Sequence, residues 1–308
     1  MEERLSRIRP APNCRKFLIN RMGSTGSTWL AKLLNSHPDV FCSHEGIVFR
    51  IHPAQNYDES DILKFIESLA AETAHGAYSA IGDIGSVWTG HVAYLPSFTT
   101  AILLRHPARL LHTRLRVSPG DRSFTDIPAH SVQVLREVWG LDPTGCEPVD
   151  QIFLHDLLTF ASQTWAIGRI DFLIRIEDLR RVDYCQRILR ALTGVRFPQR
   201  LILNGNRSRV NQRTGSSLPV ARIVDSFSRR QRDWYGQLLA DAGPFFGYNL
   251  WNDELSAAPL PGSSPTPGAG VGVRDDRRFC TAAGAFAGLS ATGCDSSLAP
   301  QSPGYNNA

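Results

Sequence analysis

The stretch Arg21-Met22-Gly23-Ser24-Thr25-Gly26-Ser27-Thr28-Trp29-Leu30 decides the fold that we expect for this chain. The apolar run 16–20 precedes it, and the helix-like pattern 29–34 follows it. A strand, a loop rich in glycine and hydroxyl side chains, and a helix form the phosphate cradle of α/β proteins. Glycine lets the backbone approach an anion closely, and the N–H groups at the helix start favour negative charge. The sequence therefore predicts an anion-binding loop at residues 23–28.

The side chains of this loop narrow the kind of anion. Hydroxyl donors are present at Ser24, Thr25, Ser27 and Thr28, and Arg21 adds a positive charge. The loop that binds nucleotide triphosphates has the pattern GxxxxGK[ST], but this chain reads Gly-Ser-Thr-Trp where that pattern needs Gly-Lys-Ser/Thr. No lysine in the loop reaches a terminal phosphate. The residues therefore favour an anion-binding strand–loop–helix and argue against an ATPase of the Walker type.

The same stretch resembles the 5′-phosphosulfate loop of the sulfotransferases that use 3′-phosphoadenylyl sulfate (PAPS). In that family a basic residue precedes a Gly/Ser/Thr run and often an aromatic residue. The continuation 33–40, followed by His44-Glu45-Gly46, also resembles bacterial members. The resemblance implies PAPS as the sulfuryl donor. It assigns the donor's contacts to Arg21, Gly23, Ser24, Thr25, Gly26, Ser27 and Thr28, and places Trp29 against the adenine ring.

One departure from the family pattern is a repeat within the loop. Gly-Ser-Thr at 23–25 occurs again at 26–28. The extra residues would displace Arg21 from the start of the helix, unless they bulge outward. The position of Arg21 relative to the helix start therefore bears on whether the loop serves catalysis or only nucleotide binding. Without the flanking resemblance, a Ser/Thr-rich turn that simply caps a helix is the alternative interpretation.

A second stretch, Leu103-Leu104-Arg105-His106-Pro107-Ala108-Arg109, resembles the 3′-phosphate element of the same family. There an arginine ends a strand, an x-Pro turn follows, and a hydroxyl lies one to two helical turns further on. Arg105 and Thr113 occupy these places, and the donor fork of an arginine matches phosphate oxygens. The alternative is a solvated arginine with a threonine on a polar helix face. We interpret Arg109 and Arg114 as solvated helix charges.

The resemblance also implies how the reaction would proceed. Arg21 would stabilise charge on the leaving phosphate, and no metal ion is needed. Glu45 is our candidate for the base that accepts the proton of the acceptor, with His44 as the rival and Asp83 as a weaker one. Glu177-Asp178-Leu179 matches a sequence common in these enzymes, and we expect it to be structural, through helix capping. The acceptor would be a small molecule, a carbohydrate or a lipid.

Length, composition and charge agree with such an enzyme. The chain has 308 residues, 42% of them hydrophobic, and a formal net charge of +4. This mild excess suits a polyanionic ligand but is too small to indicate nucleic-acid binding. The six cysteines form no CxxC pair and no metal-like spacing, so we expect buried free thiols. Because no signal-like start and no membrane-spanning apolar run occur, we expect a soluble, cytoplasmic protein.

Predicted strands alternate with predicted helices along the chain, which favours a parallel sheet covered on both faces. The strands are expected at 16–20, 40–42, 78–83, 99–104 and 170–176, and the helices at 27–36, 59–74, 107–116, 151–168, 181–193 and 226–240. The fold class is therefore α/β, a three-layer α/β/α arrangement. Residues 119–150 are expected to be an irregular insertion, and 253–308 a disordered tail after a single domain at 1–252.

The sequence thus leads to one main hypothesis and two alternatives. The main hypothesis is a sulfotransferase that moves a sulfuryl group from PAPS to a hydroxyl or amine acceptor and releases adenosine 3′,5′-bisphosphate. The first alternative is a P-loop nucleotide kinase or NTPase. The second is a catalytically impaired relative that binds the nucleotide without transferring sulfate.

Overall fold

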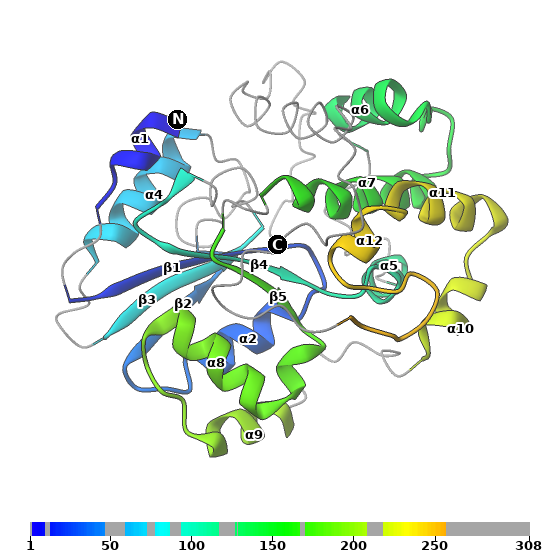
Figure 1. Ribbon diagram of the computed structural model, residues 1–308. Coiled ribbons are helices and arrows are strands. Elements are labelled where there is room, and N and C mark those ends of the chain that lie inside the picture. Colours follow the sequence, from blue (N-terminus) through cyan, green and yellow to red (C-terminus); the bar gives the residue numbers. More distant parts are fainter. Residues whose placement is uncertain are drawn as a thin grey trace, which may run out of the picture.

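A five-stranded sheet forms the centre of the described part of the chain, with all neighbouring strands parallel and in the order β2-β3-β1-β4-β5 (Figure 1). The computed structural model describes residues 2–9, 13–46, 59–72, 78–86, 94–116, 127, 129–166, 170–207 and 218–256. The strands are β1 (Arg15–Arg21), β2 (Val40–His44), β3 (Ala80–Gly85), β4 (Thr99–Leu104) and β5 (Phe172–Arg175). The predicted α/β class with a central parallel sheet is confirmed.

The central strand is apolar because both of its faces are covered. Phe17, Leu18 and Ile19 are consecutive in β1, and all three are fully buried. Successive side chains of a strand point to opposite faces, so Phe17 and Ile19 belong to one core and Leu18 to another. A continuous apolar run therefore signals a strand in the middle of a three-layer structure.

Three helices cover the first face of the sheet and lie below it in Figure 1: α2 (Ser27–Leu34), α8 (Val182–Thr193) and α9 (Gln199–Arg207). Helix α8 buries Tyr184, Cys185, Ile188, Leu189 and Leu192, which recur at helical spacing. It ends at Gly194, whose φ of 76° lies in the left-handed region that glycine adopts without steric cost.

The opposite face is covered in two sections. Helix α4 (Glu59–Ala71) packs on Leu18 and Ile81. A larger core on Ile102 and Leu104 involves α5 (Pro107–Leu115), α6 (Ala129–Trp139), α7 (Pro148–Ser162), α10 (Val220–Asp225), α11 (Arg229–Leu239) and α12 (Ala242–Phe245). Two 3₁₀ turns, η4 (Gln163–Ala166) and η5 (Asp178–Arg180), and the N-terminal α1 (Glu2–Arg7) complete the described elements.

The prediction of an irregular insertion at 119–150 is wrong at Ala129–Trp139 and from Pro148 onward, where the chain is helical. Helix α6 lies within it and buries Val134 and Leu135 in the large core. Helix α7 begins at Pro148, where the ring pre-sets the helical backbone and the missing N–H is not needed. Helix α6 was not predicted, whereas α7 corresponds to the helix expected at 151–168 and begins three residues earlier. Residues 117–126 and 128 lie outside the described residues.

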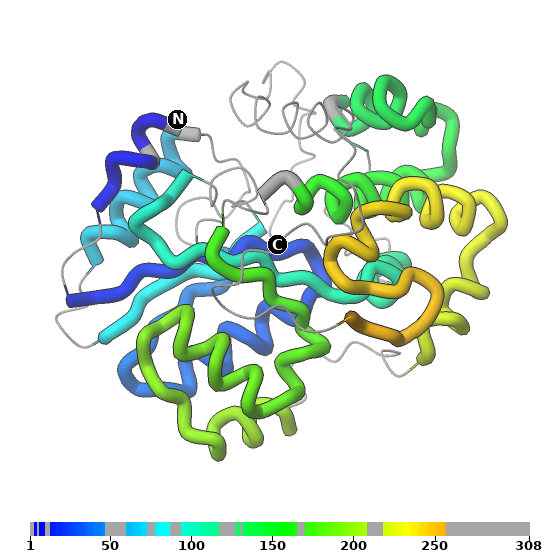
Figure 2. Tube along the Cα trace, viewed as in Figure 1, coloured from blue at the N-terminus to red at the C-terminus, as the bar shows by residue number. Residues whose placement is uncertain are grey.

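The described body extends past the boundary expected at residue 252. Tyr248 and Leu255 form an isolated antiparallel bridge, and the Ser256 N–H bonds to the Gly247 carbonyl oxygen. In Figure 2 this segment (orange) passes beside α5 (teal). The remainder of the predicted disordered tail, 257–308, lies outside the described residues.

Two sequence expectations concern the whole described chain. Cys14, Cys42, Cys146 and Cys185 are buried free thiols, as expected, whereas Cys280 and Cys294 lie outside the described residues. Among the helices described here, none combines the length and the apolar character that crossing a membrane requires.

Candidate functional site

The candidate site begins where β1 ends and α2 starts. Arg21 is the last residue of β1, and α2 begins at Ser27 directly after Gly26, whose φ is 86°. When the pattern GxxxxGK[ST] is aligned on Gly26, Arg21 takes the place of the first glycine and Ser27 that of the lysine. On this alignment the connection, with both copies of Gly-Ser-Thr included, has the same length as the GxxxxGK[ST] loop.

The loop folds inward. Met22 and Thr25 are buried, and Thr25 Oγ1 donates to the Met22 carbonyl oxygen at 2.9 Å. Ser24 adopts a φ of 64°, which is uncommon for a residue with a Cβ. The repeat therefore does not force an outward bulge: its first copy forms the turn, and its second copy opens the helix.

Within the described part of the chain, the first backbone N–H groups of α2 have no acceptor in their own helix. The Leu30 N–H bonds to the Gly26 carbonyl oxygen at 3.1 Å and closes the first turn of the helix. The amides of Ser27, Thr28 and Trp29 precede that bond and have no acceptor within the helix. Together with the helix dipole, they give this end of the helix a positive potential.

Arg105 joins the second sequence motif to this loop. Its Nη1 donates to the Ser24 carbonyl oxygen at 3.0 Å and to Thr113 Oγ1 at 3.3 Å. Burial lowers the pKa of Arg105 from its ordinary value, and the Glu177 carboxylate opposes this effect. The structure thus brings Arg105, Thr113 and the 23–28 loop together at the carboxyl edge of the sheet.

The position in the sheet is one where α/β proteins bind ligands. Strands β1 and β4 are neighbours, and the chain leaves β1 toward β2 on one side and β4 toward β5 on the other. This makes the gap beyond β1 and β4 a topological switch point. The loop after β1 and Arg105 after β4 flank that point.

Arg21 and Glu45 form an ion pair between Nη2 and Oε1. Their side chains are 16% and 8% exposed. The Glu45 Oε2 atom accepts from the Ser86 backbone N–H and from its hydroxyl, each at 3.3 Å. Arg21 Nε is buried and has no hydrogen-bond partner within the described part of the chain. The two candidate catalytic groups therefore face each other.

The backbone at Glu45 is also unusual. Its φ is 55°, in the left-handed region, and its N–H continues the sheet by bonding to the Ile84 carbonyl oxygen at 2.8 Å. A residue with a side chain pays roughly 1 kcal/mol or more to adopt this conformation. From this turn the Glu45 side chain reaches Arg21.

His44 has a different partner from Glu45, although the two are adjacent in sequence. Its Nε2 lies 2.9 Å from Ser27 Oγ, at the start of α2. Burial lowers the pKa of His44, the Arg21 guanidinium lowers it further, and the Glu45 carboxylate partly offsets them. His44 is therefore neutral near pH 7 and hydrogen-bonded to a loop hydroxyl.

Trp29 and Asp83 have structural partners. The Trp29 indole N–H donates to the Gly205 carbonyl oxygen at 2.8 Å, and its ring packs on the core below the sheet. This contact fastens α9 to α2. The buried Asp83 accepts from the Gly46 N–H at 2.9 Å and from the Ser43 hydroxyl at 2.5 Å. It holds the turn after β2, in which Glu45 lies.

Two arginines that we expected to be solvated are instead paired. Arg109 bonds to Asp253 at 2.5 Å, and Arg114 Nε bonds to Asp156 Oδ2 at 3.0 Å. Arg114 also packs on the loop, because a Cβ added at Gly23 would lie 3.1 Å from its Nη1. Arg114 is thus a cation at the site that the sequence analysis missed, since nothing local signals its contact with Gly23.

Glu177 was expected to be structural through helix capping; it is the N-cap residue of η5, but its side chain makes no capping bond to that turn and has other partners. Its Oε1 accepts from the His106 N–H at 2.9 Å, and its Oε2 accepts from the Tyr248 hydroxyl at 3.1 Å.

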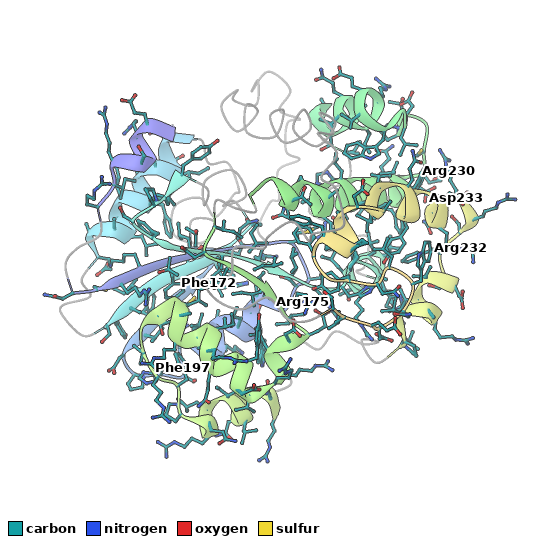
Figure 3. All side chains as sticks on the ribbon, viewed as in Figure 1. Phe172, Arg175, Phe197, Arg230, Arg232 and Asp233 are labelled. Atoms are coloured by element: carbon teal, nitrogen blue, oxygen red, sulfur yellow. The ribbon has the colours of Figure 1, made fainter. Side chains whose placement is uncertain are left out.

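Asp178 pairs with Arg175, which is fully buried at the end of β5 (Figure 3). Arg175 also donates to the carbonyl oxygens of Gly247 and Ser256. Through Glu177 and Arg175, residues 246–256, which we call the C-terminal segment, are connected to the turn that carries Arg105.

Comparisons with known proteins give no further assignment. No family model matches this chain, and no curated protein matches it at a significant level. The functional interpretation therefore rests on the residues of the site.

Proposed function

We propose that this protein is a sulfotransferase that moves a sulfuryl group from PAPS to a hydroxyl or amine acceptor. The observation that supports it most is the bond from Arg105 to the Ser24 carbonyl oxygen, between residues 81 positions apart. This bond holds the Arg105 guanidinium against the loop that leads into α2, whose first amides would bind an anion. A nucleotide with one phosphate group at each end of its ribose needs two such anchors close together.

The residues present fit that donor. The N–H groups and hydroxyls at Ser27 and Thr28 would hold the 5′-phosphosulfate, and Arg105 with Thr113 would hold the 3′-phosphate. Among the described residues the hydrogen bonds of Arg105 use only Nη1, which leaves its remaining donors for a phosphate. Ser27 stands where a nucleotide-triphosphate loop has its lysine, and this disfavours a kinase or NTPase.

The ion pair suggests how this chain's own groups would assist transfer. Glu45 would accept the proton of the acceptor while the acceptor oxygen or nitrogen attacks sulfur and the S–O bond to the 5′-phosphate breaks. A protonated Glu45 no longer neutralises Arg21. The full charge of Arg21 would then be available to the leaving phosphate at the moment when negative charge develops there.

Isothermal titration with adenosine 3′,5′-bisphosphate and with ATP tests the proposal. We expect the bisphosphate to bind more tightly, with no requirement for magnesium. Preference for ATP with magnesium would overturn the proposal and favour the kinase or NTPase alternative.

The Arg105→Ala variant tests the assignment of the two anchors. It should weaken bisphosphate binding about 10- to 100-fold, the usual effect of losing a hydrogen bond to a charged group, and weaken 5′-AMP binding much less. The control is Arg187→Ala, which removes an exposed arginine of α8. Equal losses for both ligands would remove Arg105 from the 3′-phosphate site.

One observation favours the second alternative, a nucleotide binder without transfer. Arg21 and Glu45 are paired with each other in the structure, so Arg21 is not available to a leaving phosphate and Glu45 is not available to an acceptor proton. Tight bisphosphate binding without sulfate transfer from PAPS to phenol, sugar or lipid acceptors would identify this state.

A further inference from the structure

The proposed sulfuryl transfer assigns no role to the contact between Ser27 and His44. Ser27 is the first residue of α2 and is 5% exposed. His44 is the last residue of β2, two strands away from β1 in the sheet. Their Oγ and Nε2 atoms are 2.9 Å apart. A side chain from the sheet thus contacts the hydroxyl that would meet an anion at the helix start.

Either atom can be the donor in the hydrogen bond between Ser27 Oγ and His44 Nε2, so this bond can have two directions. In one, the Ser27 hydroxyl donates its hydrogen to Nε2, and no hydroxyl hydrogen is left for an anion. In the other, Nε2 carries the ring's hydrogen and donates to Oγ, so the hydroxyl hydrogen is free to point elsewhere. An anion at the start of α2 accepts hydrogen bonds only, and its presence therefore selects the second direction.

We propose that His44 is a positioning residue, which donates from Nε2 to Ser27 Oγ and so directs the Ser27 hydroxyl hydrogen to an oxygen of the donor's 5′-phosphate. This inference rests on the proposed function. It assigns His44 to ligand binding through Ser27 and leaves the role of base to Glu45.

The surroundings of the pair agree with this direction. Arg21 is paired with Glu45, so the positive potential at this place comes from the first amides of α2, which have no acceptor within the helix, and an anion is the favoured partner for the hydroxyl. Ser27 occupies the lysine position of the GxxxxGK[ST] pattern. The Ser27 hydroxyl, oriented by His44 of β2, would thus supply a short, neutral hydrogen-bond donor. The GxxxxGK[ST] pattern has the long, charged side chain of a lysine at the same position.

A double-mutant cycle on Ser27 and His44 tests the inference. Binding of adenosine 3′,5′-bisphosphate and of adenosine 3′-phosphate is measured for the wild type, Ser27→Ala, His44→Ala and the double variant. We expect each single variant to weaken bisphosphate binding about tenfold, and the double variant to bind no more weakly than Ser27→Ala. Adenosine 3′-phosphate, which lacks the 5′ group, should bind all four proteins equally.

Rescue by a conservative variant adds a second readout. His44→Gln can place an amide N–H near the position of Nε2, so it should restore most of the bisphosphate affinity. The control is His37→Ala, because His37 packs on Phe197 away from the loop and should leave both affinities unchanged.

The possible failures are distinguishable. Additive losses in the cycle, or a His44→Ala variant with normal bisphosphate affinity and reduced turnover, would overturn the inference while the proposed function stands. Equal losses for both nucleotides would also overturn it, since they would indicate general damage to the site. A wild type that does not bind the bisphosphate would overturn the proposed function and this inference together.

Discussion

Arg21 and Glu45 are charged side chains whose chemistry depends on each other. Glu45 pairs with Arg21 from a left-handed backbone conformation directly after β2. Buried ion pairs contribute little net stability, because removing two charges from water offsets their attraction. The strained turn and the ion pair are therefore better explained by the chemistry of the site than by the stability of the fold.

The Glu45→Gln variant tests the role of this carboxylate. It keeps the shape of the side chain but cannot accept a proton, so sulfate transfer should fall about 100-fold or more. Bisphosphate affinity should hold or rise, because Arg21 loses its negative partner. Turnover and titration are measured together, with Glu67→Gln on α4 as the exposed control. Unchanged turnover would move the base to another residue.

His106, which follows Arg105, is a buried neutral histidine. Its Nδ1 accepts from the Ala108 N–H at 3.2 Å, and its Nε2 lies 2.8 Å from the Asn249 carbonyl oxygen, so Nε2 carries the hydrogen. Burial lowers the pKa of His106 to about 4. Protonation at Nδ1 would end its role as the N-cap of α5.

This histidine predicts a pH dependence of stability. Between about pH 6.5 and pH 4 the unfolded chain binds a proton at this position and the folded protein does not. The free energy of unfolding should therefore fall as the pH falls through this window, by up to about 3 kcal/mol from His106. Urea unfolding of His106→Asn, which keeps a capping oxygen, should show a flatter profile. An identical profile in both proteins would contradict this assignment.

At the scale of elements, the turn between β4 and α5 is held from two sides. Glu177, after β5, binds the His106 N–H, and Tyr248 of the C-terminal segment binds Glu177. His106 and Tyr248 also make an edge-on ring contact. The turn that carries Arg105 is thus fixed by segments distant in sequence, and its geometry does not depend on β4 and α5 alone.

The Tyr248→Phe variant tests this link. It leaves Glu177 Oε2 without the Tyr248 hydroxyl in a buried setting, so we expect a loss of about 1–3 kcal/mol in the free energy of unfolding. The matched control is Tyr235→Phe, because the Tyr235 hydroxyl bonds to a neutral acceptor, the Leu250 carbonyl oxygen. Its loss should be smaller. Equal losses would show that the charge of Glu177 adds nothing to this bond.

At the scale of the whole molecule, the C-terminal segment closes the structure around β5 and α5. Arg175 is fully buried, and three of its described bonds go to carbonyl oxygens of this segment, those of Phe246, Gly247 and Ser256. Asp253 binds Arg109 of α5 and the Val220 N–H of α10. The segment therefore belongs to the folded body through Ser256.

Two truncations test where the folded body ends. A chain ending at Ser256 should keep the melting temperature of the full chain, because it retains every described contact. A chain ending at Trp251 loses Asp253 and the Ser256 acceptor of Arg175, so it should melt at least about 5 °C lower. Equal melting temperatures for the two truncations would place the boundary at 252, as the sequence alone suggested.

The sequence sufficed for most of the sheet because its signals are local. Apolar runs such as 16–20 and 99–104 read as buried strands, and the Gly-Ser-Thr repeat marked the start of α2. Short or turn-flanked helices were missed: α6 and α9 each bury little apolar surface, and their patterns are interrupted by polar residues. How the repeat folds was also not visible in the sequence, because the conformation of a loop becomes clear only when both of its ends are fixed.

The sequence by itself determined an α/β protein with a Gly/Ser/Thr loop after its first strand and a basic residue after a later one, because strand, glycine and hydroxyl patterns lie within a few residues of each other. Only the tertiary structure decided the partners: Arg21 with Glu45, His44 with Ser27, and Arg105 with the Ser24 carbonyl oxygen. Parallel strands end at one edge of the sheet, and their order brings together residues that the chain keeps far apart. Sequence separation carries no information about that order, which arises from packing both faces of the sheet.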